Sequence, residues 1–226
     1  MIYPMYFFSE DFTAIEPLLE TVPFRICHFK EGDYLWTPGD SIEELHYIKS
    51  GVVQLAMNHP SGRERIISFH GRSTLFPVFY EGPVQLEDSL EGHVLTETHT
   101  VAIKKDDFYR ILHHHPSMSM AVISWYTKFV NLLLYETGHQ GYNNGFNKLC
   151  NIIYLLICRD KSELDITQER LGQILGMSRV NINRYLRRLK EEGIIQTQRM
   201  RLEVLNKDRL KAYCSEATQY MSSLSH

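Results

Sequence analysis

The sequence predicts an α+β fold in which an antiparallel β-domain is followed by a long helix and a helix-turn-helix unit. Three observations support this fold class. Short β-branched and aromatic runs separated by turn residues fill residues 24–103. An uninterrupted apolar stretch follows over residues 118–135, and a basic helical pattern with a central Gly-x-Ser turn occupies residues 167–193. We expect a β-domain at 1–116, a long helix at 117–137, a hinge at 138–145 and a C-terminal domain at 146–226.

Length and composition fit a globular chain. The 226 residues suit one large or two modest domains, and 43% of them are hydrophobic. The N-terminus lacks the basic start and small-residue cleavage site of a signal peptide, so we expect a cytoplasmic protein. The cysteines are scattered without C-x-x-C spacing, and we expect reduced thiols at Cys27, Cys150, Cys158 and Cys214.

The β-domain is predicted from turn residues that recur at regular spacing between strand-like runs. Strand-like runs at 24–40, 45–57, 63–71 and 93–103 are separated by turn signals that include Gly51 and Gly62. Turns at this spacing are typical of an antiparallel sandwich or barrel, so we expect a β-roll.

The long helix carries an apolar seam with 4-3-4-3 spacing, typical of pairing between helices. The seam residues are Met118, Val122, Trp125, Phe129 and Leu132. Leu133, Leu134 and Tyr135 widen the apolar face. We therefore expect the helix to pack on its own domain and also to pair with a twin. The Gly- and Asn-rich run GHQGYNNG then predicts the hinge.

The basic segment reads as a helix-turn-helix. Thr167 is a candidate N-cap for a first helix, Gly176 supplies a left-handed turn, and Ser178 caps a second helix. The second helix has an apolar inner face of Ile182, Leu186 and Leu189. The alternation in residues 194–206 predicts a β-hairpin that would form the wing of a winged helix.

Charge distribution points to DNA as the partner. Residues 168–201 hold eight Arg or Lys against three Glu, which is +5 locally and leaves −8 on the rest of a chain whose net charge is −3. The start of the second helix should contact base edges in the major groove, through Arg179, Val180, Asn181 and Arg184. Phosphate contacts are expected from Thr167, Ser178, Arg187, Arg188, Lys190 and Arg199.

The chain resembles the Crp/Fnr family of bacterial transcription regulators over nearly its whole length. LGQILGMSRVNINRYLRRLKEEGII matches the family's recognition unit, and FKEGDYLWTPGD, LHYIKSGVVQL and SGRERIISFHG match its effector domain. The resemblance implies a cyclic-nucleotide-binding-like jelly roll, a homodimer joined by the long helix, and a palindromic DNA operator. It also implies RNA polymerase as a partner, and an effector that sets the angle of the DNA-binding heads. Arg179 and Arg184 match base-reading arginines, but Val180 replaces a common glutamate, so we expect thymine in the half-site.

The effector is predicted to be a small organic molecule. Positions that hold cyclic AMP in the family fall here at Pro77-Val78 and Asp88-Ser89, which lack the needed groups. Only Cys27 lies near the N-terminus, so no iron–sulfur cluster is expected. The aromatic candidates resemble the halophenol-sensing subfamily, in which a lysine of the long helix meets a phenolate. The expected pocket residues are Phe69, Phe76, Phe79, Tyr80, Trp125, Tyr126 and Lys128, although Val78 replaces a second lysine of that subfamily.

Other classes of function remain open. A β-domain with 11 histidines could belong to a cupin-like metal-dependent enzyme. That chemistry needs a His-x-His cluster, and the strand region has none. We therefore expect no catalytic residue and no metal, and we interpret His113-His114-His115 as the polar end of a helix. A redox- or haem-sensing regulator and a ligand-free adaptor are the further alternatives.

Overall fold

The computed structural model of the chain describes residues 5–37, 40, 43–59, 62, 64–77, 89–157, 162–198 and 201–223. It divides into two compact units, a β-domain unit that ends at Val130 and a C-terminal unit that begins at Asn131. The predicted α+β class is confirmed, with strands in the first unit and a helix-turn-helix in the second.

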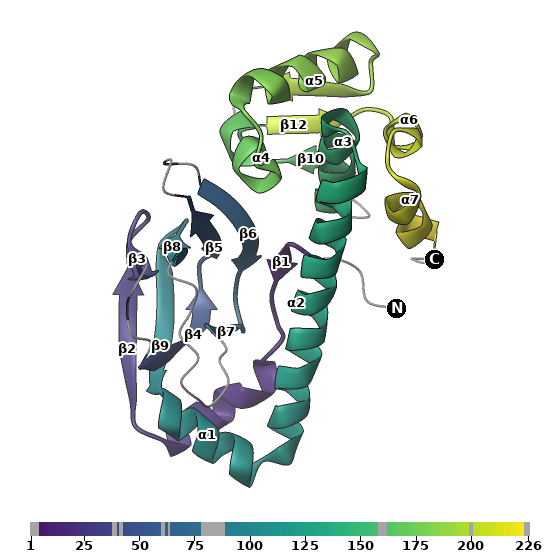
Figure 1. Cartoon of the computed structure of the whole chain (residues 1–226). Helices are drawn as coiled ribbons and strands as arrows, with labels where there is room; N and C mark the ends of the chain where they lie inside the picture. Colours follow the sequence, from purple (N-terminus) through teal and green to yellow (C-terminus); the bar gives the residue numbers. More distant parts are fainter. Residues whose placement is uncertain are drawn as a thin grey trace. The chain divides into compact units, whose positions relative to one another are not determined.

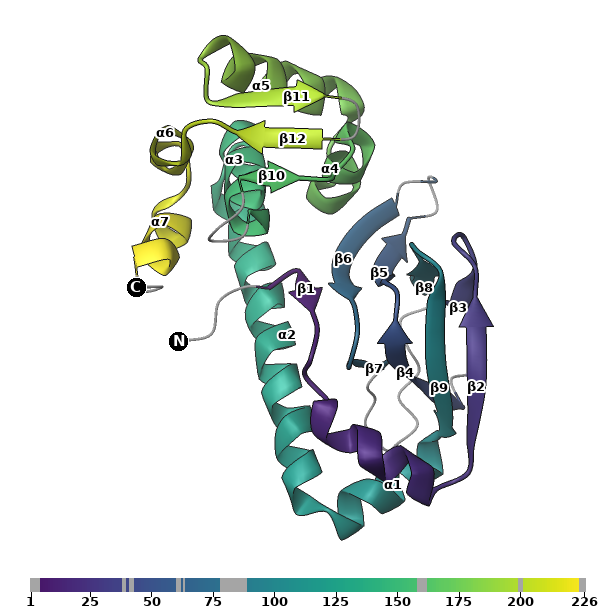
Figure 2. The same cartoon turned by 180° about the vertical axis from the view of Figure 1, so that it is seen from behind.

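The β-domain consists of two sheets (Figures 1 and 2) with strand orders β1-β6-β5-β8-β3 and β2-β9-β4-β7. Most of the pairs are antiparallel, as predicted, but β1 pairs parallel with β6. The two-residue strand β1 was too short for periodicity to reveal. The strands are β1 (Phe7–Phe8), β2 (Phe24–Phe29), β3 (Tyr34–Trp36), β4 (Glu44–Ser50), β5 (Val53–Asn58), β6 (Glu64–His70), β7 (Leu75–Phe76), β8 (Leu90–Val94) and β9 (Thr98–Lys104).

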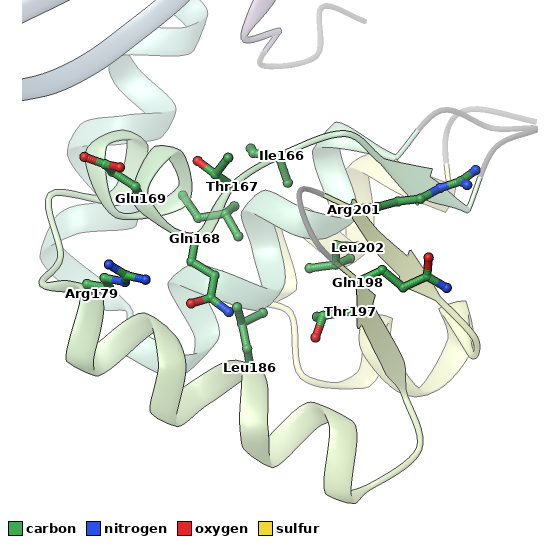
Figure 3. A pocket seen from close by; sticks show the side chains of 11 residues that line it. Ile166, Thr167, Gln168, Glu169, Arg179, Leu186, Thr197, Gln198, Arg201 and Leu202 are labelled. Carbon is green, nitrogen blue, oxygen red and sulfur yellow. The ribbon is translucent and has the colours of Figure 1, made fainter.

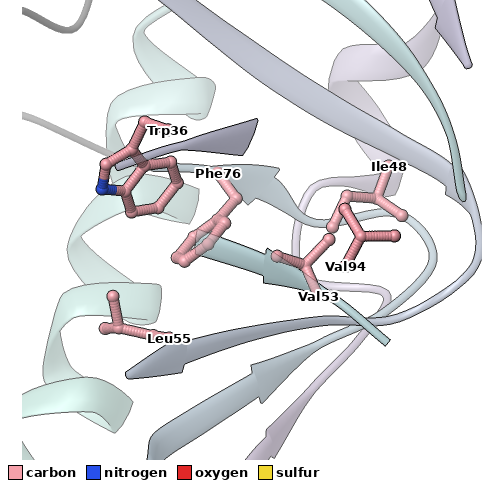
Figure 4. Close-up of a cluster of buried hydrophobic side chains, with 6 residues drawn as sticks. All are labelled: Trp36, Ile48, Val53, Leu55, Phe76 and Val94. Atoms are coloured by element: carbon pink, nitrogen blue, oxygen red, sulfur yellow. The ribbon is translucent and has the colours of Figure 1, made fainter. Parts of the chain in front are cut away.

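The core of this unit lies between the sheets, where inward side chains alternate along each strand. One cluster comprises Trp36, Ile48, Val53, Leu55, Phe76 and Val94 (Figure 4). The indole ring of Trp36 packs directly against Gly92. A Cβ on that glycine would stand only 2.5 Å from the ring. The glycine in β8 therefore makes room for the largest side chain of the cluster.

The helices that the structure describes in this unit are the 3-10 helix η1 (Thr13–Thr21), α1 (Lys105–His114) and the first half of α2 (Pro116–Tyr142). His113 and His114 are exposed at the end of α1, as expected of a polar helix terminus before Pro116. Helix α2 continues through Gly138 and Gly141, so the predicted hinge at 138–145 is wrong for most of its length. The break is confined to Asn143 and Asn144. A glycine weakens a long helix but does not by itself end it.

The seam predicted to pair with a twin is also wrong, because it faces inward. Met118, Trp125 and Leu132 are buried within the chain, and Val122 and Phe129 are partly buried. A different set of apolar side chains on α2 is exposed: Met120, Ile123, Val130, Leu133 and Leu134. Helix α2 thus has two apolar sides, and the sequence alone did not show which side the β-domain covers.

The C-terminal unit contains the second half of α2, the helices α3 to α7 and a sheet of order β10-β12-β11. The predicted hairpin is confirmed as β11 and β12. The elements of this unit after α2 are α3 (Gly145–Leu156), β10 (Glu163–Leu164), α4 (Gln168–Leu175), α5 (Arg179–Glu191), β11 (Ile195–Gln198), β12 (Arg201–Val204), α6 (Lys207–Ala212) and α7 (Glu216–Ser223).

A buried polar side chain in this unit, Asn151, links α3 to α2 and to the loop before α7. Asn151 of α3 is fully buried, and its Oδ1 accepts a hydrogen bond from Ser215 N at 2.9 Å. Its Nδ2 lies 3.0 Å from His139 Nδ1 on α2. Asn151 therefore fastens the loop before α7 to two helices, which explains a polar residue within an apolar run.

The cysteines that the structure describes are free and buried. Burial raises the pKa of the Cys214 thiol to about 12 and also raises the pKa of the Cys150 thiol. Cys158 lies outside the described residues. In the part of the chain described here, no helix is both long and apolar enough to cross a membrane.

Two glycines allow a matched test of backbone conformation. Gly176 has φ 62°, whereas Gly138 lies within α2, and a Cβ at either position would meet no atom within 4 Å. We expect Gly176→Ala to cost about 1–2 kcal/mol, because an L-residue is strained in the left-handed region. Gly138→Ala should instead stabilise the helix by about 0.5–1 kcal/mol. Urea unfolding measures both, and a stabilising Gly176→Ala would contradict the left-handed turn.

Candidate functional sites

Helix α5 is held as an exposed rod by its apolar inner face. Ser178 caps the helix by accepting a hydrogen bond from Asn181 N at 3.4 Å. Ile182, Leu186 and Leu189 are each at most 2% exposed, in a unit where α5 packs against α3 and α4. The positions opposite these three side chains are left facing solvent. The predicted helix-turn-helix geometry is therefore present, with Gly176 in the left-handed turn as expected.

The outer face of α5 presents the residues predicted to read bases. Arg179, Val180 and Arg184 are exposed, and Val180 is 76% exposed despite its apolar side chain. Arg184 stacks on the Tyr185 ring at 4.9 Å and donates to its hydroxyl at 3.1 Å. This contact holds the guanidinium at the helix surface. Asn181 is half-buried, at the edge of this face.

Sequence reasoning missed Asn183, which is exposed on α5 next to Arg184. It lies three residues after Val180 and four before Arg187, so helical spacing places it beside both. The same spacing could have identified it as a further base or phosphate contact.

Arg188, which was predicted to contact phosphate, also has a structural role within the C-terminal unit. Its guanidinium lies 4.1 Å from the Phe146 ring centroid and 5.2 Å from that of Tyr213. Its Nε donates to Glu192 Oε1 at 3.0 Å, and Tyr213 donates to the other oxygen of Glu192 at 2.7 Å. The hydrogen bonds from Tyr213 and Arg188 lower the pKa of the Glu192 carboxyl. Arg188 thus joins α5 to α3 and to the end of α6.

The other residues predicted to contact phosphate differ in what their side chains already contact. Arg187 and Lys190 are exposed, and Arg187 makes only a long 3.7 Å pair with Glu191. Thr167 and Ser178 act as N-caps, as predicted, so their side-chain oxygens are already engaged with backbone N–H groups. Arg199 lies outside the described residues.

A groove of about 300 Å³ lies between α4, α5 and the wing strands (Figure 3). Gln168 and Arg179 line it from the helices, and Gln198 and Arg201 line it from the wing. Arg201 forms an ion pair with Glu163 of β10. The first turn of α4 also offers the positive end of the helix dipole. The groove therefore offers hydrogen-bond donors to a phosphate backbone, beside the carboxylate of Glu169.

A second candidate site lies in the β-domain, around His70 at the end of β6. The His70 ring is stacked between the rings of Phe8 and Phe76, with centroids 5.3 and 4.0 Å away. Trp125 of α2 lies 6.1 Å from it, so Phe76 and Trp125, two residues predicted to line an effector pocket, both contact His70. Phe69 is buried, and burial raises the pKa of the half-buried Tyr126. Phe79 and Tyr80 lie outside the described residues, as do Val78 and Asp88.

Lys128, the predicted partner of an acidic ligand, is already paired. Its Nζ lies 2.5 Å from Oδ1 of Asp11, whose side chain is only 3% exposed. Among the described residues, Asp11 Oδ2 has no hydrogen-bond partner. The Lys128 charge is thus largely compensated within the chain.

Comparisons with known proteins match both units. A model of the Crp-like helix-turn-helix domain matches residues 147–213, and one of the cyclic nucleotide-binding domain matches residues 26–115. The global nitrogen regulator of Synechococcus elongatus is 20% identical over 82% of this chain and 87% of its own length. The cAMP-activated global transcriptional regulator CRP of Salmonella typhimurium is 22% identical over 70% of this chain and 78% of its own.

The solved structures agree on the fold. CprK complexed with OCPA aligns with a TM-score of 0.74 at 17% identity, covering 92% of this chain and 98% of that chain. At this identity the likeness shows the fold alone, so the resemblance to the halophenol-sensing subfamily stays a prediction. Both curated relatives are named as regulators, which favours a regulatory over an enzymatic role.

Replacing two adjacent arginines of α5, Arg187 and Arg188, distinguishes a structural role from a DNA-binding role. We expect Arg188→Ala to lower the melting temperature, because it removes the ion pair with Glu192 and the contacts with Phe146 and Tyr213. Arg187→Ala should leave the melting temperature nearly unchanged and should weaken DNA binding at every sequence. Thermal unfolding and salt-dependent DNA titrations measure these effects. An Arg188→Ala protein of unaltered melting temperature and flattened salt dependence would restore the phosphate role.

Proposed function

We propose that the chain is a DNA-binding transcription regulator of the Crp/Fnr family, because it matches models of the cyclic nucleotide-binding domain and of the Crp-like helix-turn-helix domain. In this proposal the protein is a homodimer that binds a palindromic operator under the control of a small aromatic effector. The observation that carries the DNA-binding part is the amphipathic build of α5. Its apolar side chains are buried, and Arg179, Val180 and Arg184 are presented to solvent.

The chemistry of this face favours a defined half-site. An arginine can donate two hydrogen bonds to guanine O6 and N7 in the major groove, whereas valine fits the methyl group of thymine. Val180 stands next to Arg179 and one turn from Arg184, so the half-site should combine guanine contacts with a thymine. The groove beside α4 supports phosphate contacts that position the helix.

Replacement of Arg184 tests this assignment. Arg184→Ala should cost roughly 1–3 kcal/mol on a duplex that the wild-type protein selects from random sequences, with the loss confined to one base position per half-site. Lys190→Ala is the matched control, since it should weaken all duplexes alike and reduce the salt slope by about one. Fluorescence anisotropy measures both variants. If Arg184→Ala keeps full selectivity, α5 does not read the bases as proposed.

The exposed side of α2 supports the homodimer. Met120, Ile123, Val130 and Leu134 are exposed at spacings of 3, 7 and 4, which is the spacing of a coiled-coil seam with Thr127 at the missing position. Large apolar side chains in a row on a surface helix are typical of an interface. A second copy of the same helix presents a complementary seam, so a twofold contact buries both at once.

Charges in this seam should separate the copies. The double variant Ile123→Glu, Leu134→Glu should sediment near the chain mass of 26.5 kDa, while the wild type sediments at about twice that mass. Leu205→Glu is the control, because Leu205 is an exposed leucine of the C-terminal unit outside α2. A double variant that stays dimeric would place the interface elsewhere.

The effector part of the proposal rests on the aromatic cluster around His70. Phe76 and Trp125 are buried there, each in ring contact with His70, and aromatic side chains of this kind suit flat apolar ligands. A cyclic nucleotide is disfavoured by Pro77, which has no N–H to offer a phosphate, and by the acidic Asp88 of the sequence. The cluster therefore supports a small aromatic ligand.

A further inference from the structure

Tyr185 of α5 contacts a predicted base-reading arginine on one side and another helix on the other. Its hydroxyl accepts a hydrogen bond from Nη2 of Arg184 at 3.1 Å, and the guanidinium carbon of Arg184 lies over its ring, 4.9 Å from the centroid. Its ring also packs edge-on against that of Phe146 in α3, with 5.8 Å between the two centroids. Tyr185 therefore links the exposed face of α5 to α3.

The first residue of α3 leaves room for this tyrosine. A Cβ on Gly145 would stand 2.7 Å from the Tyr185 hydroxyl oxygen and 3.0 Å from Cε2 of its ring. The first of these distances is shorter than packed atoms tolerate, so a side chain at residue 145 would displace the ring. Gly145 and Phe146 together thus determine where the ring of Tyr185 lies.

These two residues directly follow the break between α2 and α3. Helix α2 ends at Tyr142, and Asn144 caps α3 by accepting a hydrogen bond from Asn147 N at 3.0 Å. The cap fixes the first turn of α3, and with it the surface against which Tyr185 packs. All of these residues belong to the C-terminal unit. A shift in the first turn of α3 would therefore reach Arg184 through a single aromatic ring.

The stacked conformation of Arg184 is compatible with reading a base. Its hydrogen bond to Tyr185 uses one of five guanidinium N–H groups, so four remain for the O6 and N7 atoms of guanine. An arginine side chain also loses rotamer freedom when it binds a base, and a contact that orders it beforehand reduces this cost. Tyr185 therefore favours base reading by Arg184 and does not compete with it.

We propose that Tyr185 is a positioning residue, which holds the Arg184 guanidinium in the orientation that reads one base pair and is itself positioned by Gly145 and Phe146. Base selectivity at that position then depends on the junction between α2 and α3, through Tyr185. This inference rests on the proposed DNA-binding function, and it adds a means by which the same site is regulated.

A double-mutant cycle on the full-length chain tests the link between the two side chains. The probes are a duplex that the wild-type protein selects from random sequences and its single-base-pair variants. Tyr185→Leu should lower discrimination by about three- to ten-fold at the base position that Arg184→Ala identifies, the size expected for ordering one long side chain. Adding Tyr185→Leu to Arg184→Ala should cause no further loss. Tyr185→Phe, which keeps the ring and removes the hydroxyl, should give an intermediate value.

Gly145→Ala tests the wall that positions the ring. It should lower discrimination at the same base position as Tyr185→Leu, because the new Cβ displaces the ring. Gly141→Ala is the matched control, since Gly141 lies in α2 and a Cβ there would meet no atom within 4 Å. It should leave discrimination unchanged. The base position that Arg179→Ala identifies should keep its discrimination in all of these variants, whereas general damage to α5 would reduce it as well.

Magnetic resonance of the free chain gives a measurement that needs no DNA. The Nε–Hε signal of Arg184 is assigned by its absence in Arg184→Lys. In the wild type, the ring of Tyr185 should shift the side-chain protons of Arg184 to lower frequency and restrict the motion of Nε. Tyr185→Leu should remove both effects, and Gly145→Ala should reduce them.

The two measurements separate this inference from the regulator proposal. The positioning role is wrong if Arg184 is as mobile in the wild type as in Tyr185→Leu. It is also wrong if Tyr185→Leu weakens all duplexes alike, or costs as much discrimination in the Arg184→Ala background as in the wild type. Each of these results would leave DNA binding intact. A wild-type chain that binds no duplex, with Arg184 ordered by Tyr185, would instead overturn the regulator proposal.

Discussion

Trp125 of α2 packs among Phe8, Phe12 and Phe129, and this contact fixes which side of the helix faces the β-domain. The indole is only 4% exposed, and a buried aromatic side chain of this size contributes a large share of the packing energy of the helix. The rotation of α2 about its axis then follows. Lys128, three residues on, reaches Asp11, and the side with Ile123 and Val130 is turned to solvent. One aromatic contact thus assigns separate roles to the two apolar sides of α2.

The helix-turn-helix could be predicted from sequence because short-range rules determine it. Thr167 and Ser178 cap the helices that follow them, and Gly176 has the left-handed conformation that its position requires. Each of these features depends on residues within one turn of the chain. The inner face of α5 follows from the spacing of Ile182, Leu186 and Leu189 for the same reason. Strand content of the β-domain was likewise readable from turn residues.

What the sequence could not show depends on contacts between distant residues. The contacts of Arg188 with Phe146 and Tyr213, which are distant from it in the chain, could not be predicted from the spacing of α5. The seam of α2 was assigned to the wrong side because both sides are apolar at helical spacing. The importance of His70 was missed as well, since a lone histidine in a strand has no periodic pattern, and its stacking between Phe8 and Phe76 exists only in the fold.

The buried cysteines have a practical consequence for following the motions of the C-terminal unit. A thiol reacts with alkylating agents as its thiolate, and the raised pKa values of Cys150 and Cys214 leave almost none at neutral pH. Modification then requires a transient opening that exposes the sulfur to water. The labelling rate of these side chains would therefore report how often α3 and the end of α6 separate. A DNA duplex that stabilises the closed form of the unit would lower the labelling rate without contacting either sulfur.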